Sequence, residues 1–99
     1  MGQIFTMTKN QSEEYIKFDI TEDDFDFLQA KQLAKKTAFE KCDYPMILSW
    51  KNGKTGESYP NYECGKNERP FWIRYAEGRG ANLTIDINQG EYIFMIVKM

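Results

Sequence analysis

The stretch from Arg69 to Met99, RPFWIRYAEGRGANLTIDINQGEYIFMIVKM, decides the fold of this chain. Apolar and polar side chains alternate over residues 83–87, which is the pattern of a β-strand with one buried face. Residues 92–97 are continuously apolar, and we therefore expect a central strand that is covered on both faces. The turn sequence NQG at positions 88–90 lies between these two segments and predicts that they form a β-hairpin.

A long helix is expected earlier in the chain, from Thr21 to about Lys41. Thr21 can cap its first turn, and Asp24 stands three residues later, as in a capping box. Ile20 and Phe25 have the spacing of a hydrophobic staple around this start. One stripe at helical spacing then carries Phe27, Ala30, Ala34, Ala38 and Lys41, with Leu33 and Thr37 beside it. The alanines would let the helix axis approach a sheet closely.

Shorter segments are expected to complete the sheet. Residues 15–20 alternate between apolar and polar side chains, and residues 3–8 and 46–50 contain short apolar stretches. Residues 57–62 are expected to pair back as an edge strand, because Pro60 cannot donate a hydrogen bond to a neighbouring strand.

The segment 70–77 has two readings. Pro70 suits the first position of a short helix, on which Trp72, Tyr75 and Ala76 would share a face. The alternative is a strand, because Phe71-Trp72-Ile73 has high β-propensity. We favour the helix, which the glycines at positions 78 and 80 would end.

Size and composition limit the chain to one folded unit. Its 99 residues are 41% hydrophobic and 15% aromatic, which is too rich in apolar groups for a disordered chain. The expected fold is a single α+β domain over residues 1–99, an antiparallel sheet of about four to five strands with one long helix packed on one face and a short second helix. The protein is expected to be a monomer or a homodimer.

Net charge and targeting signals exclude several kinds of partner. The net charge of −2, with both signs well mixed, gives no overall field that would favour nucleic acid or an anionic membrane. No apolar run approaches the roughly 20 residues needed to span a bilayer. The first residues, MGQIFTMTKNQSEE, lack the basic and apolar regions of a secretory signal. We therefore expect a cytoplasmic protein that has no contact with a membrane.

The residue inventory argues against catalysis. The chain has no histidine, so a Ser-His or Cys-His nucleophile pair cannot form within it. Cys42 and Cys64 are too few for a four-cysteine zinc site, and we expect free thiols, no metal and no cofactor. Cys64, with Lys66 and Arg69 nearby, is a candidate reactive thiol, although an unreactive thiol is favoured. An enzyme is thus less favoured than a binding protein, and no catalytic residue is assigned.

Two groups of residues are candidates for binding. Trp72, Arg74, Tyr75 and Arg79 combine charge with stacking surface, as in sites that bind nucleic acid or acidic partners. Packing of Trp72 and Tyr75 onto the sheet is the favoured alternative. The basic helix segment Lys31–Lys36 lies outside the apolar stripe, and a solvated helix face explains it better than a nucleic-acid site.

Four short segments resemble a known kind of domain: LSW at 48–50, EC at 63–64, YAEGRG at 75–80 and IDINQGEYIF at 85–94. Their order is similar to that in small bacterial domains of unknown function, over about the last half of the chain. The resemblance implies a small cytoplasmic α+β protein, and it offers no catalytic or binding residues to transfer.

These observations lead to one functional hypothesis and two alternatives. We expect a non-catalytic interaction module, with an unknown protein as the favoured partner. The first alternative is a small ligand-binding protein or enzyme that uses Cys64 or Arg74. The second is a nucleic-acid binder that uses Arg74, Arg79 and the Lys31–Lys36 helix face.

Overall fold

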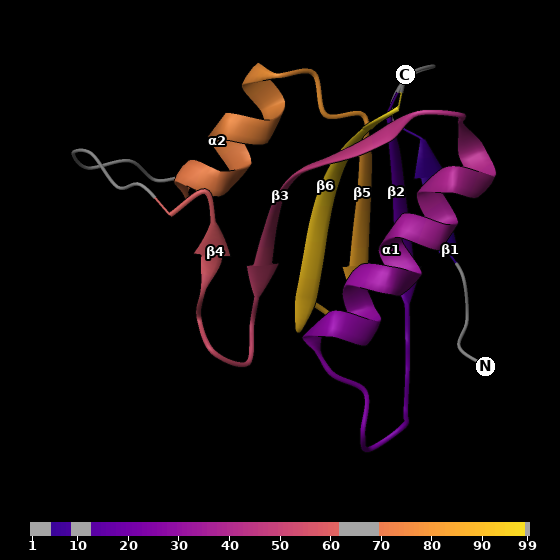
Figure 1. Cartoon of the computed structure of the whole chain (residues 1–99), viewed down its shortest axis with the longest axis vertical. Coiled ribbons are helices and arrows are strands. Elements are labelled where there is room, and N and C mark those ends of the chain that lie inside the picture. Colours follow the sequence, from indigo (N-terminus) through magenta and orange to yellow (C-terminus); the bar gives the residue numbers. More distant parts are fainter. Residues whose placement is uncertain (1–4, 9–12, 62–69, 99) are drawn as a thin grey trace.

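The computed structural model describes residues 5–8, 13–61 and 70–98. These residues form one six-stranded sheet with a helix on each face (Figure 1). The strands are β1 (Phe5–Thr8), β2 (Glu14–Phe18), β3 (Pro45–Asn52), β4 (Ser58–Tyr59), β5 (Leu83–Ile87) and β6 (Tyr92–Lys98), and the helices are α1 (Phe27–Lys41) and α2 (Phe71–Gly78). The α+β class is therefore confirmed, together with the long helix on one face and the short helix after Pro70.

The strand order across the sheet is β1-β2-β5-β6-β3-β4, and the sheet is mixed rather than purely antiparallel. The hairpin of β5 and β6 forms as predicted, with Asn88 and Gln89 both at φ 55° in its turn. The expectation of an antiparallel sheet is wrong because β2 pairs with β5 in parallel. Since α1 carries the chain from β2 to β3, it acts as a crossover between two strands of the same direction, and the hairpin inserts between them.

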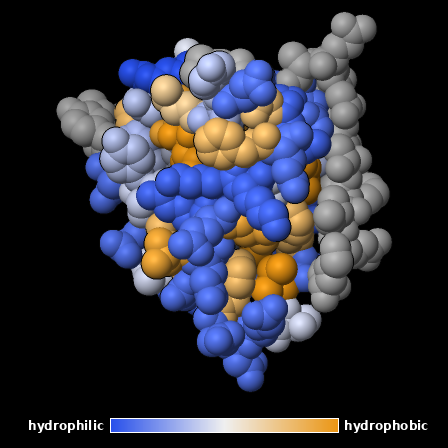
Figure 2. Space-filling model, turned by 45° about the vertical axis from the view of Figure 1, so that its right-hand side comes forward, coloured by the Kyte–Doolittle hydropathy of each residue, from blue (hydrophilic) through white to orange (hydrophobic). Residues whose placement is uncertain are grey.

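The face of the sheet under α1 is the main core. The alternate residues of β5 and β6 that point to α1 are at most 2% exposed, and the helix meets them with alanines that are almost fully buried. Phe27 closes one end of this layer, with its ring centroid 4.6 Å from that of Trp50 and 5.6 Å from that of Phe94. The alanine stripe thus works as predicted. The outer surface over α1 is mostly hydrophilic (Figure 2).

Helix α1 begins later than the sequence pattern indicated. Its N-cap is Asp26, whose side chain accepts a hydrogen bond from the backbone of Gln29 at 2.9 Å, while the Gln29 side chain accepts from the Asp26 backbone. The prediction of a cap at Thr21 is therefore wrong. The residues between the end of β2 and Asp26 carry the chain from the sheet to the helix layer. Phe25 belongs to this crossing and packs on Tyr92.

The opposite face is only partly covered. Helix α2 packs Trp72 and Ala76 against Leu48 and Met95, over β3 and β6. It does not reach the β1 and β2 side of the sheet (Figure 1). For this reason the expectation that β6 is fully covered on both faces is only half correct, since Ile93 stays half-buried. Within the described ranges, no helix is long and apolar enough to cross a membrane.

Candidate binding groove

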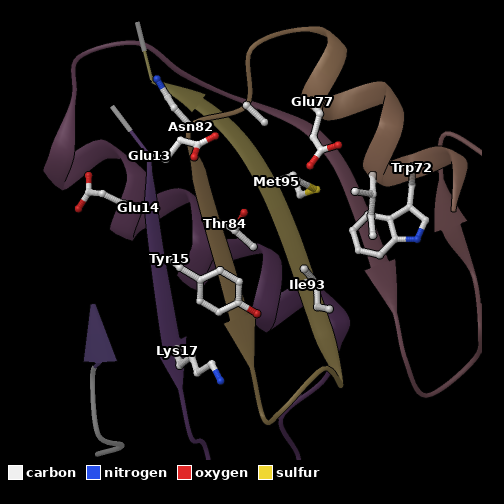
Figure 3. A pocket seen from close by; sticks show the side chains of 12 residues that line it. Glu13, Glu14, Tyr15, Lys17, Trp72, Glu77, Asn82, Thr84, Ile93 and Met95 are labelled. Atoms are coloured by element: carbon white, nitrogen blue, oxygen red, sulfur yellow. The ribbon is translucent and has the colours of Figure 1, made fainter. Parts of the chain in front are cut away.

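A groove of about 450 Å³ lies where α2 stops short of the far side of the sheet. Strands β2, β5 and β6 form its floor, and α2 with the residues that follow it forms one wall (Figure 3). Most of its lining is apolar, and polar side chains stand at its two ends. The residues on which its chemistry depends are Glu13, Tyr15, Lys17, Trp72, Glu77, Thr84, Ile93 and Met95.

Strand register explains why these side chains share one surface. Tyr15 lies opposite Thr84 in the parallel pair, and Thr84 lies opposite Met95 in the antiparallel pair. Successive residues of a strand point to opposite faces, so the row formed by these three side chains faces away from α1. The next row in the same direction joins Lys17, Asp86 and Ile93. The floor is therefore built by the mixed pairing that the sequence did not predict.

Asp86 anchors the floor from within the sheet. It is 7% exposed, and its Oδ2 accepts a 2.6 Å hydrogen bond from the Tyr15 hydroxyl. Its Oδ1 accepts a 2.6 Å hydrogen bond from the backbone of Gly90 in the hairpin turn. Burial, and after it the hydrogen bond to Asp86, raises the pKa of Tyr15 above its ordinary value. Tyr15 therefore keeps its proton, and both carboxylate oxygens of Asp86 are occupied.

The two ends of the groove differ in charge. Glu77 extends from α2 and Glu13 from the start of β2, and both side chains reach toward the end of the groove above Met95 (Figure 3). Lys17 stands at the other end, with its ammonium 5.6 Å from the centroid of the Tyr15 ring. The lining is thus negative at one end and positive at the other.

Glu14, between these residues in sequence, does not add to the charge of the groove. Its carboxylate pairs with Lys41 at 3.0 Å and also with Lys98. The hydrogen bond from Lys98, and then that from Lys41, holds the pKa of Glu14 below its ordinary value. Glu14 is therefore a neutralised group at the rim that ties β2 to α1 and β6.

The four residues proposed as a binding cluster do not form one surface. Trp72 is only 5% exposed and packs inward, where it also lines the groove. On the neighbouring ridge of α2, the Arg79 guanidinium lies 3.8 Å from the centroid of the Tyr75 ring. Arg74 lies 5.3 Å from the centroid of the Phe71 ring, and the Phe71 and Tyr75 centroids are 5.9 Å apart. Two arginines and two aromatic rings therefore alternate along α2 and its C-cap residue Arg79, and Trp72 is separate from them.

The other candidates have no part in the groove. Lys35 and Lys36 are exposed on α1, and Lys31 is half-buried there. Cys42 is a half-buried free thiol at the end of α1. Cys64 and Arg69 lie outside the described residues. Among the described side chains, no group of three or more His, Cys, Asp or Glu residues could hold a metal ion.

Sequence reasoning did not find the groove. The alternation over residues 15–20 and 83–87 shows which side chains share a face of each strand, but it does not show what lies over that face. One usable signal is Tyr15, which lies on the same side of its strand as the charged residues Glu13 and Lys17. A second is the apolar character of Ile93 and Met95 on the face of β6 that Thr84 and Asp86 share. Only the strand order shows that these positions are neighbours.

The fold and the groove define a class: a small α+β domain with a half-covered mixed sheet. Residues 13–96 match the family described as "Domain of unknown function (DUF5619)", and the chain belongs to this family. This agrees with the resemblance to small domains of unknown function.

Two comparisons place the chain beside archaeal proteins. It is 44% identical over 69 residues to an uncharacterized protein of Archaeoglobus fulgidus, which covers 69% of this chain and 71% of that protein. A crystal structure of a novel protein from Archaeoglobus fulgidus superposes with a TM-score of 0.73 at 30% identity, over 86% of this chain and 93% of the other. A bacterial source for the family stays a prediction.

Proposed function

We propose that the protein is a non-catalytic binding module and that its binding site is the groove between α2 and the β2–β5 side of the sheet. The observation that carries this proposal is the groove itself, about 450 Å³ in volume. Sites for small molecules are concave, mostly apolar and typically ≈300–1,000 Å³, with a few polar groups that orient the ligand. This groove has that size and composition, and the largely buried Trp72 contributes to its wall.

The polar groups of the groove favour binding over chemistry. Asp86 is the most buried carboxylate near the floor, but Tyr15 and Gly90 occupy its two oxygens. Tyr15 has a raised pKa and so holds its proton at neutral pH. Neither group is therefore poised as a general base, and the chain offers no histidine for that role.

The proposal is tested by filling the groove. Thr84 lies on the floor, and Thr84→Phe would occupy the space without changing charge. Gln32→Phe is the matched control, because Gln32 is exposed on α1, on the opposite side of the sheet. Each variant is dialysed against a metabolite extract, and the retained compounds are identified by mass spectrometry. We expect wild type and Gln32→Phe to retain the same compound and Thr84→Phe to lose it. Equal retention by all three proteins would refute the groove as the site.

A second candidate is binding of a macromolecule through the outer ridge of α2. The alternation of Arg74, Phe71, Tyr75 and Arg79 supports it, because stacked arginine and aromatic groups are frequent in such interfaces. Arg79→Ala should reduce capture of a specific protein from a cell lysate, and Lys35→Ala on α1 is the control. Binding of a fluorescent single-stranded oligonucleotide that also depends on Arg79 would instead favour nucleic acid.

Location and assembly remain part of the proposal. We propose a cytoplasmic protein that acts as a monomer or a homodimer. Light scattering after size-exclusion chromatography gives the mass of the assembly, and fractionation of the source cells gives its location.

A further inference from the structure

We propose that the ligand of the groove is a small organic cation: an amine or guanidinium group carried on an apolar body. This inference rests on the proposed function, since it names the class of ligand for the same groove. Three features of the lining carry it: the two carboxylates at one end, the apolar surface between the ends, and the ammonium group at the far end.

The acidic end supplies the recognition of a positive charge. Glu13 and Glu77 approach this end from two different elements, and Glu77 lies in the last turn of α2 (Figure 3). The C-terminal end of a helix carries partial negative charge, which adds to that of the carboxylates. Both side chains also interact with other groups of the protein, so the cation would join an existing polar arrangement. Charge-assisted hydrogen bonds of an ammonium to carboxylate are stronger than neutral ones.

The middle of the groove selects an apolar body. Trp72 and Ile73 stand in the wall, and Ile93 and Met95 in the floor. A fully charged or highly hydrated ligand would have to leave these surfaces exposed to water or lose its own hydration there. A hydrocarbon or aromatic body instead buries apolar area at about 25 cal/mol per Å².

Lys17 fixes the direction of the ligand. It lies four residues after Glu13, which directly precedes β2, and this corresponds to ~13 Å at the usual rise per residue of an extended chain. A cation is repelled at the Lys17 end and attracted at the Glu77 end, so only one orientation satisfies both charges. An anion with the same body would meet the reverse pattern, with a single ammonium against two carboxylates.

Three probes of nearly equal shape test the charge of the ligand: 4-phenylbutylamine, 4-phenylbutanol and 4-phenylbutyrate. The chain contains two tryptophans, so the protein has two indole N–H signals in an NMR spectrum, and Trp50→Phe assigns the signal of Trp72. We expect the amine to shift the Trp72 signal saturably and to bind about fivefold more tightly than the alcohol, because its hydrogen bonds to carboxylate are charge-assisted. The butyrate should bind more weakly than the alcohol. Equal or tighter binding of the butyrate would overturn the proposal.

Variants separate the class of ligand from the existence of the site. Glu77→Gln should lower the affinity for the amine about fivefold and leave that for the alcohol unchanged. Lys17→Gln should raise the affinity for the amine, and Glu40→Gln, on exposed α1 surface, should change nothing. If Thr84→Phe abolishes binding while Glu77→Gln has no effect, the groove binds ligands but the cation class is wrong. If Thr84→Phe changes nothing, the groove is not the site and the proposed function fails as well.

Discussion

The two faces of the sheet differ in how completely a helix covers them. Under α1, side chains of β5 and β6 are at most 2% exposed, and alanines bring the helix close to them. Under α2, Trp72 and Ala76, with the half-buried Ile73 beside them, cover part of the sheet, and the neighbouring groove stays open, with a mostly apolar lining and polar side chains at its ends. A completely packed face gives stability and leaves no room for a ligand. The half-covered face contributes less to stability, and the space that remains there is what binding requires.

The largest effect should distinguish adjacent residues of β6 that point to opposite faces. Phe94 is fully buried and stacks on Phe27, so Phe94→Ala should lower the free energy of unfolding by about 3–5 kcal/mol. Ile93 is half-buried at the edge of the groove, and Ile93→Ala should cost about 1 kcal/mol. Urea denaturation measures both. Equal losses would mean that the face under α2 is packed as completely as the face under α1.

The second effect concerns the link between groove and hairpin. Asp86→Ala removes the acceptor for the Tyr15 hydroxyl and for the Gly90 backbone, and should cost about 2–3 kcal/mol. Asp19→Ala, at an exposed position after β2, should stay within about 0.5 kcal/mol of wild type. If Asp86→Ala lowers the free energy of unfolding no more than Asp19→Ala does, the hydrogen bonds of Asp86 do not stabilise the face under α2.

The third prediction tests at which residue α1, the helix that covers the packed face, begins. Asp26→Ala should cost about 1 kcal/mol because it removes the observed N-cap of α1. Thr21→Ala should change the free energy of unfolding by less than about 0.5 kcal/mol, since Thr21 is exposed and precedes the helix. Thermal and urea unfolding of the two variants compare them directly. A larger loss of unfolding free energy for Thr21→Ala than for Asp26→Ala would indicate that α1 begins at Thr21.

The contrast between the faces also shows what the sequence could predict. The face under α1 was predicted well, because periodicity in a helix and alternation in a strand depend on local spacing. The alanine stripe and the Asn88–Gly90 turn are of this kind. The start of α1 was missed because Thr21 and Asp26 both begin a capping-box pattern, and only the distance between layers decides between them.

The groove could not be predicted from local sequence patterns, because it depends on a long-range strand pairing. It depends on β2 lying beside β5, although paired residues of the two strands, such as Glu14 and Leu83, are 69 positions apart in the sequence. Alternation showed which residues of each strand share a face, but not which strands are neighbours. Trp72 was among the candidate binding residues, and its place in the groove wall depends on the position of α2, which local patterns do not give.

The smallest effect concerns the rim where the two faces meet. Glu14 joins β2 to Lys41 of α1 and to Lys98 of β6. Because these bonds lower the pKa of Glu14 in the folded state, its contribution is present above the unfolded pKa of about 4.3 and is lost as the pH falls through the folded value. Glu14→Gln should therefore cost less than about 1 kcal/mol at pH 7, since the groups are partly exposed, and the difference from wild type should shrink below pH 4.

Salt provides the independent check on this ion pair. At pH 7, raising the ionic strength to about 1 M shortens the screening length to about 3 Å and should narrow the gap between Glu14→Gln and wild type in urea denaturation. Glu40→Gln, on the exposed surface of α1, is the control for the loss of one negative charge. A gap that is the same at pH 7 and pH 3, and at low and high salt, would show that Glu14 acts through packing. Packing of Glu14, and not its ion pairs with Lys41 and Lys98, would then join β2 to α1 and β6.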